Sequence, residues 1–262
     1  ALNEVVPQSA VSLLLRFSEP LDQAGASDPL SYRLDPGGIR PASADWSASD
    51  PTIVFLSFTS SLENFKTYTL RIDGLRDQAG NETPNLAYSF SFLFAEPPLS
   101  GDLAISEIMA DPTPGQGVLP ETEYLELHNR SAKVLSTQGL QLRVGNSTVS
   151  LPTATILPGA WVLICAAADT SGFSEIASKI ALPSLPGLSN SGASIRLTTT
   201  NGETVDALTY ASSWYRDAKK DDGGYSLELI TPLQPSDCPQ NWQASLAPQG
   251  GTPGAPNSIP QE

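Results

Sequence analysis

The chain has 262 residues, with 28 acidic and 14 basic side chains that give a formal net charge of −14 at pH 7. This excess of carboxylates excludes a nucleic-acid partner, because binding to a phosphate backbone relies on clusters of Lys and Arg. Hydrophobic residues make up 40% of the chain and charged residues 16%, which excludes an acidic disordered tail and indicates one or two folded domains.

The first part of the chain, residues 1–95, is divided into short strands by Asp-Pro, Pro-Gly-Gly and Ala-Gly-Asn turns. Apolar side chains at Tyr68, Leu70 and Ile72 alternate with polar ones, the period of two that is expected of a half-buried strand. Residues 88–94 alternate in the same way, whereas residues 53–56 form a continuous apolar run typical of a strand buried on both faces. About five to seven strands in this length predict a β-sandwich.

A proline-bearing connector at residues 96–101 follows, and its Pro pair predicts a stiff linker at a domain boundary. Residues 102–258 again read as short alternating strands, with Asn201-Gly202 as a strong hairpin signal. We therefore predict an all-β chain of two tandem sandwiches. Residues 259–262 are expected to be a tail or the start of the next linker.

No run approaches the roughly 18 apolar residues that a membrane helix requires, so we expect no membrane insertion. The N-terminus lacks the basic and apolar regions of a signal peptide. If the protein is exported, its signal has been removed or lies upstream in a longer chain. The linker-like composition of residues 256–260 favours the second explanation.

Several motifs of the second sandwich follow one another in a recognisable order. They are Ile105-Ser-Glu-Ile-Met-Ala-Asp111, Glu123-Tyr-Leu-Glu-Leu-His-Asn-Arg-Ser131, and the stretches at 157–163, 188–197, 225–228 and 250–258. Together they resemble the lamin tail domain, an immunoglobulin-like sandwich found at the end of nuclear lamins and in exported bacterial proteins. The versions with Trp214-Tyr-Arg-Asp217 before Asp222-Gly-Gly224 are similar to those in large surface proteins of Bacteroidota. The heptad rod of lamins has no counterpart in this sequence. Filament assembly is therefore not among the properties that the resemblance implies.

The first sandwich resembles the bacterial Ig-like domains of surface-layer and adhesin arrays. The resemblance rests on two motifs, residues 15–22 and residues 68–81. The two motifs together are more specific than either one alone. It implies a non-catalytic, extracellular or cell-surface module with structural or adhesive roles. The expected partners are other domains of the same large protein or neighbouring surface proteins.

Two cysteines, Cys165 and Cys238, are too far apart in sequence for a CxxC motif. One alternative is a buried thiol at Cys165, which ends an apolar run, and an exposed thiol at Cys238, which lies in a polar loop. The other is a disulfide that joins the C-terminal loop to a core strand. We favour the disulfide, which predicts an oxidising compartment.

Three groups of carboxylates and amides are candidates for calcium, which takes six to eight oxygen ligands. The alternative is that these Asp and Asn side chains simply form turns through Asx hydrogen bonds. No EF-hand spacing supports calcium, and no other cofactor is expected. The candidate ligands are Glu19, Asp22, Asp77 and Asn81 in the first sandwich, and Asp111, Glu121, Glu123, Asp217, Asp221 and Asp222 in the second.

Trp214 and Tyr215 lie among basic residues and are the best candidates for an exposed aromatic patch that binds a glycan. Packing in the core is the interpretation we favour for this pair, and it is also the expectation for Trp161. The single His of the chain, His128, has no partners in sequence for a nucleophilic triad, so we predict no catalytic residues and no enzyme. The competing interpretation is a carbohydrate-binding or targeting accessory module of a secreted hydrolase.

Overall fold

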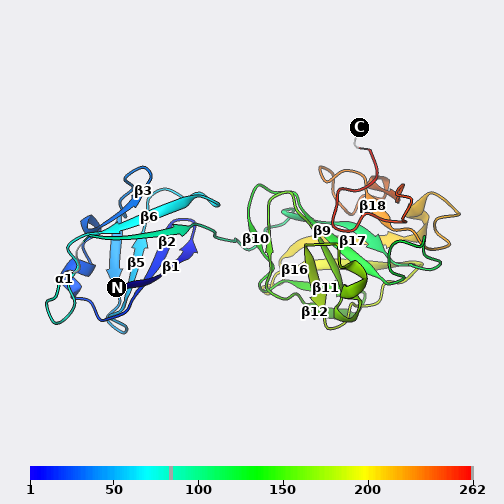
Figure 1. Cartoon of the computed structure of the whole chain (residues 1–262). Coiled ribbons are helices and arrows are strands. Elements are labelled where there is room, and N and C mark those ends of the chain that lie inside the picture. The colour runs from blue at the N-terminus through cyan, green and yellow to red at the C-terminus, as the bar shows by residue number, and fades with distance from the viewer. Residues whose placement is uncertain (83–84, 261–262) are drawn as a thin grey trace. The chain divides into compact units, whose positions relative to one another are not determined.

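The computed structural model describes residues 1–82 and 85–260. The chain divides into two compact units, Ala1–Phe94 and Ala95–Glu262 (Figure 1). Strands make up 39% of the chain and helices 8%, so the all-β fold with sandwich-like sheets is confirmed. Each unit builds its own hydrophobic core.

The first unit is a sandwich of two sheets with one shared core. The four-stranded sheet consists of β1 (Leu2–Ser9), β2 (Ser12–Phe17), β5 (Ile53–Ser57) and β4 (Ser43–Trp46), in that order. The three-stranded sheet consists of β3 (Tyr32–Asp35), β6 (Thr67–Ile72) and β7 (Leu86–Ser91). Alternate residues of β2, β5 and β6 point inward, which is the period of two that burial on one face imposes.

The expectation that residues 53–56 are buried on both faces is wrong. Val54 and Leu56 have no exposed surface, but Phe55 between them keeps 39% of its surface exposed. The strand β5 lies inside its sheet and has only one covered face. A short turn of helix, α1 (Gln23–Ala26), and a 3-10 turn, η1 (Pro29–Ser31), connect the two sheets, and Asp22 and Asp28 cap them.

The second unit packs a six-stranded sheet against a four-stranded one. The larger sheet has the order β15 (Lys179–Leu182), β14 (Trp161–Ala166), β9 (Tyr124–Asn129), β8 (Leu103–Met109), β18 (Leu227–Leu229) and β19 (Trp242–Ala244). The smaller sheet has the order β12 (Ser147–Ser150), β11 (Gln141–Val144), β16 (Gly192–Thr198) and β17 (Thr204–Ala211). A short pair, β10 (Leu135–Ser136) and β13 (Thr155–Ile156), stands beside them. The core of the unit includes Ile105, Leu127 and Ile164 from the larger sheet and Leu142 and Ile195 from the smaller one.

Two of the strands predicted in this unit carry buried residues on both faces. All seven residues of β8 and all six of β9 are buried, although their sequences alternate as half-buried strands do. One face packs on the smaller sheet. The other face is covered by the C-terminal residues, as described below, and this cover positions the candidate site.

The connector expected at residues 96–101 is hydrogen-bonded to the second unit. The amide of Glu96 donates to the carbonyl of Val134 (2.9 Å), and the amide of Gly101 donates to the carbonyl of Val205 (3.0 Å). The expected tail also begins inside this unit, because Ile259 is only 6% exposed. Residues 261 and 262 of that tail lie outside the described part of the chain.

Truncation of a core residue in the second unit should test the packing directly. Leu127 on β9 is fully buried, so Leu127→Ala should lower the free energy of unfolding by about 2–5 kcal/mol. The matched control is Leu233→Ala, because Leu233 is 92% exposed and its loss should change stability by less than about 0.5 kcal/mol. Urea unfolding followed by tryptophan fluorescence measures both, and equal stabilities of the two variants would contradict the packing.

Candidate functional site

Three buried glutamates lie in a row across three neighbouring strands of the six-stranded sheet. The strand register places Glu107 on β8 opposite Glu126 on β9 and opposite Glu228 on β18. All three side chains have no exposed surface. We call these residues the glutamate row.

The C-terminal residues 250–258, here called the C-terminal strap, lie over the glutamate row and donate hydrogen bonds to it. This segment is part of the red C-terminal stretch beside β18 in Figure 1. The bonds run from Thr252 N to Glu107 Oε1 (2.8 Å), from Thr252 Oγ1 to Glu228 Oε1 (3.0 Å), from Gly254 N to Glu126 Oε2 (2.5 Å), and from Ser258 N and Oγ to Glu228 Oε2 (2.7 and 2.6 Å). Each carboxylate therefore accepts at least one hydrogen bond from the strap, and Thr252 binds both Glu107 and Glu228.

Glycines allow the strap to lie this close to the sheet. A Cβ atom on Gly251 would lie 2.2 Å from the hydroxyl of Tyr124 and 2.6 Å from Oε1 of Glu107. Gly250 has a φ of +91°, a conformation that favours glycine, and a Cβ there would lie 2.1 Å from the carbonyl of Gly224. The Gly-rich composition of this segment is therefore a packing requirement.

Burial raises the pKa of two members of the glutamate row. It raises the pKa of Glu107 from 4.5 to about 7, helped by the charge of Glu228 and opposed by hydrogen bonds from Ser226, Tyr124 and Thr252. Burial also raises the pKa of Glu126 well above its ordinary value, and the charge of Glu107 adds to this effect. The row therefore tends to keep a proton near neutral pH.

The hydrogen bonds of the row are shared unequally between carboxylate oxygens. Oε1 of Glu107 accepts from the Tyr124 and Ser226 hydroxyls, both at 2.6 Å, and from the strap. Its Oε2 is buried without a partner among the described residues. Within the described chain, no group of three or more His, Cys, Asp or Glu side chains is arranged to hold a metal ion. The chemistry that this arrangement supports is the anchoring of a loop by buried carboxylates.

Sequence reasoning missed this row, although the signal was present. Glu126 and Glu228 each lie between two leucines, in Leu125-Glu-Leu127 and Leu227-Glu-Leu229, and Glu107 lies between a serine and an isoleucine. Alternation alone places such residues on a solvent face. Only the strap, which is far away in sequence and resembles a linker in composition, shows that this face is covered.

The four candidate calcium ligands of the first unit do meet in part. Leu21 forms a β-bridge with Asp77, and Glu19, Asp77 and Asn81 line one hollow of about 370 Å³. Both carboxylate oxygens of Asp77 accept from Asn81 (2.8 and 2.7 Å), and Asp22 accepts from the amides at the start of α1. These contacts are the Asx turns of the alternative interpretation.

The carboxylates of the second candidate group, Asp111, Glu121 and Glu123, each bind a different partner. Asp111 accepts from Asn190 (2.6 Å), Glu121 from the amide of Gly115 (2.9 Å), and Glu123 from the amide of Leu188 (3.0 Å). Burial and the nearby charge of Asp111 leave the pKa of Glu123 raised. Each carboxylate fixes its own loop.

The third group is a turn on the surface. Asp217 accepts from the amide of Lys219 through its side chain (3.0 Å) and from the amides of Lys220 and Asp221 through its carbonyl. Asp221 and Asp222 are exposed. Calcium binding stays a prediction for all three groups, and none of the described residues forms a ready-made metal site.

The candidate exposed aromatic patch at Trp214 and Tyr215 is wrong. These residues are only 7% and 4% exposed and belong to the core of the second unit. The 3-10 turn η3 (Ser212–Tyr215) directs both rings inward, where Trp214 packs 5.9 Å from the ring of Trp242. Arg216 adopts a left-handed conformation (φ 55°) and ends this turn, so the basic residues that suggested exposure lie beyond it.

The predicted disulfide is also wrong, because both cysteines are free. Cys165 is buried in β14, in a small cluster with Met109, Tyr124 and Phe173. Cys238 precedes the 3-10 turn η4 (Pro239–Asn241), which leads directly into β19 at the far edge of the same sheet. Strands about 4.8 Å apart place these positions much farther apart than the roughly 7 Å limit for a disulfide.

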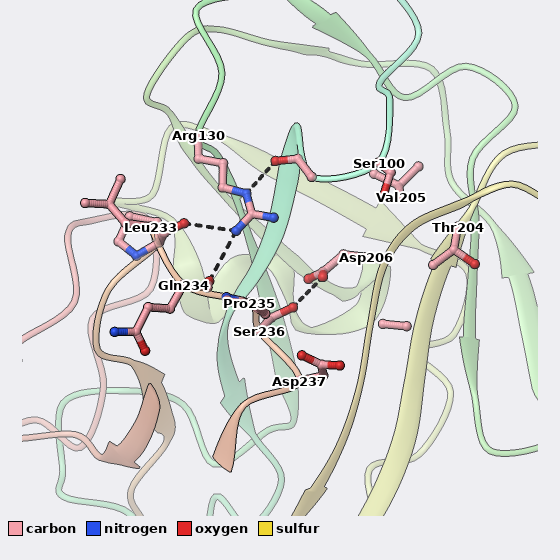
Figure 2. Close-up of a pocket in the computed structure, with 13 residues that line it drawn as sticks. Ser100, Arg130, Thr204, Val205, Asp206, Leu233, Gln234, Pro235, Ser236 and Asp237 are labelled. Atoms are coloured by element: carbon pink, nitrogen blue, oxygen red, sulfur yellow. Dashed lines mark hydrogen bonds between the residues drawn. The ribbon is translucent and has the colours of Figure 1, made fainter. Parts of the chain in front are cut away.

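A cavity of about 620 Å³ in the second unit lies beside the loop at residues 232–237 (Figure 2). Arg130 ties this loop to the start of β8 by donating to the carbonyls of Gly101, Pro232 (2.9 Å) and Gln234 (3.4 Å). The hydroxyl of Ser236 donates to Asp206, whose other oxygen accepts from the amide of Ile105 (2.7 Å).

No His side chain joins this Ser–Asp contact. Burial raises the pKa of Asp206, and His128 is not among the residues that line the cavity. His128 is instead 7% exposed and stacks on Trp161 with ring centroids 4.3 Å apart. Burial lowers its pKa, so this His is neutral near pH 7 and packs as an aromatic residue.

Comparisons with known families agree with this architecture. Residues 3–92 match the family model of a bacterial Ig-like domain, and residues 96–212 match that of the lamin tail domain. The two domains therefore follow one another in the order that the motifs predict. No curated protein matches the chain.

Among solved structures, the chain is similar to the N-terminal part of the bacterial S-layer protein SbsC. The identity is 16%, the TM-score is 0.37, and the match covers 80% of this chain and 43% of that one. A structure of surface layer protein SbsC, domains 1-6, matches at 14% identity and a TM-score of 0.33, with 80% and 40% covered. The chain thus spans less than half of these structures, and the fold assignment rests on the family models and the strand topology.

The stability of the second unit should depend on pH through the glutamate row. Because Glu107 has a pKa of about 7 when folded and 4.5 as its ordinary value, the folded chain keeps a proton that the unfolded chain releases. The contribution of Glu107 to the free energy of unfolding should therefore be complete below pH 4.5 and be lost, on the order of 3 kcal/mol, as the pH rises through about 7. Glu107→Gln should reduce this slope, whereas Glu203→Gln at an exposed turn should keep it. An unchanged slope in Glu107→Gln, measured by urea unfolding across pH 4–8, would contradict the assignment.

The thiols give a second test. Intact mass spectrometry without reductant should find two free thiols, and a thiol reagent should modify partly exposed Cys238 in the native protein. Cys165, which has no exposed surface, should react only after unfolding. A mass lower by two hydrogens, with no native reactivity, would restore the disulfide.

Proposed function

We propose that this pair, a bacterial Ig-like domain followed by a lamin tail domain, is a non-catalytic structural module of a larger bacterial cell-surface protein. Its partners are other domains of the same protein or neighbouring surface proteins. The observation that carries the proposal is that a bacterial Ig-like domain is followed directly by a second sandwich, whose buried polar groups hold its own loops and C-terminal residues. An adhesive role for the module is part of the same proposal.

The polar interior supports a load-bearing or spacing role better than catalysis. The glutamate row binds the C-terminal strap, and Arg130 binds the loop at residues 232–237. The cavity beside this loop contains a Ser–Asp contact, and no His is among its lining residues. These groups therefore hold loops and the C-terminal strap in place within the unit.

The location of the module is supported by the bacterial Ig-like family model. None of the helices in the described residues is long and apolar enough to cross a membrane. The high acidity of the chain is suited to an exposed module, because net charge far from zero keeps a protein soluble.

Labelling of intact cells tests this location. An epitope tag inserted beside Val118, a loop residue that is 74% exposed, should be detected by an antibody on whole cells of the bacterium that makes the protein. A cytosolic marker protein in the same cells should stay unlabelled and is the control for lysis. Labelling only after lysis would overturn the surface assignment.

A further inference from the structure

The smaller sheet of the second unit has an outward face that differs from the acidic rest of the chain. Strands β11 and β16 lie at its centre (Figure 1). Among the described side chains that point outward from its four strands, none is Asp or Glu, although the chain has a net charge of −14. The outward residues with side chains are Gln141, Arg143, Thr148, Ser150, Ser194, Arg196, Thr198, Thr204, Ala207, Thr209 and Ala211. We call this surface the arginine face.

Two arginines stand directly opposite each other at its centre. The register pairs Arg143 on β11 with Arg196 on β16, and both side chains are exposed. Together with Gly145 and Ser194 they line a hollow of about 240 Å³. Like charges at directly opposed positions destabilise a sheet, so this pair is unfavourable without an anion.

Most hydrogen-bonding capacity of these guanidinium groups is unused by the described residues. Arg143 donates through Nε to the carbonyl of Gly145 (2.9 Å), and Arg196 donates through Nη1 to the hydroxyl of Thr204 (3.2 Å). Neither forms an ion pair with a carboxylate in the described chain. A guanidinium group has five N–H donors arranged to bind an oxyanion through two bonds.

We propose that the arginine face binds an anionic polysaccharide, with a carboxylate or sulfate group of the polymer held between Arg143 and Arg196. The row of Ser and Thr hydroxyls beside them supplies donors and acceptors for sugar hydroxyls. The surrounding acidity repels a polyanion from other surfaces and so restricts binding to this face.

Other occupants fit this surface less well. A protein interface has an apolar and aromatic centre, whereas two alanines, Ala207 and Ala211, are the apolar residues among the outward residues of this face. A neutral glycan would find no aromatic ring on these positions for stacking. A nucleic acid requires more cationic contacts than two arginines in a strongly acidic protein can provide.

Binding should be measured by isothermal titration calorimetry on the full chain at low salt, with polygalacturonate as the carboxylate probe and dextran sulfate as the sulfate probe. We expect saturable binding of at least one probe, no binding of neutral dextran, and weakening as salt increases. Arg143→Gln and Arg196→Gln should each weaken binding about tenfold, and the double variant should abolish it. Lys219→Gln, which removes one exposed positive charge elsewhere in the same unit, should bind as the unchanged chain does.

Stability measurements separate lost binding from lost folding. Because each Arg→Gln change relieves repulsion between the opposed guanidinium groups, the free energy of unfolding should stay the same or rise. Binding of neither probe by the unchanged chain would overturn the proposal, as would full binding by a folded double variant. The inference does not require the proposed surface location, since it concerns the isolated chain.

Discussion

Burial of three carboxylates without a cation is the constraint on which the second unit depends. An ionised group that leaves water costs several kcal/mol unless hydrogen bonds or opposite charge offset this cost. The fold supplies hydroxyl and amide donors from Tyr124, Ser226 and the C-terminal strap, and it raises the pKa of Glu107 so that a proton is retained. The row and the strap therefore require each other. Without the strap, the row loses several of its donors, and without the row, the amides of Thr252, Gly254 and Ser258 lose their acceptors on the sheet.

This dependence also defines where the domain ends. The lamin tail family model matches residues 96–212, but β18, β19 and the C-terminal strap lie beyond that range. Glu228 on β18 completes the row, and Trp242 on β19 packs against Trp214 in the core. The residues after 212 are thus an integral part of the sandwich, and a boundary drawn at the end of the matched stretch would remove one third of the larger sheet's strands.

Alternation and turn signals are local features of the sequence. They were sufficient to predict the strands and the two sandwiches. The candidate site depends on strand order, which those signals do not contain. Cys165 and Cys238 lie in or next to strands of one sheet, but four strand positions separate β14 from β19. Trp214 follows two serines and precedes Arg216, yet a single 3-10 turn directs its ring into the core. Glu107, Glu126 and Glu228 look like solvent-facing residues until the strap, more than twenty residues after Glu228, is placed over them.

The second unit has few basic side chains, and most of them form structural contacts. Most basic side chains there are used to fasten loops: Arg130 binds three carbonyls, Lys133 pairs with Asp102 (3.0 Å), and Lys220 donates to the carbonyl of Ser245 (2.6 Å). Arg143 and Arg196 bind no segment that is distant in sequence. Each donates only to a residue within eight positions of itself in the chain. A fold that places most of its other cations in structural contacts but sets two arginines side by side on an exposed sheet tolerates their repulsion. Binding of an anion explains that arrangement, since the bound oxyanion would turn an unfavourable pair into a shared contact.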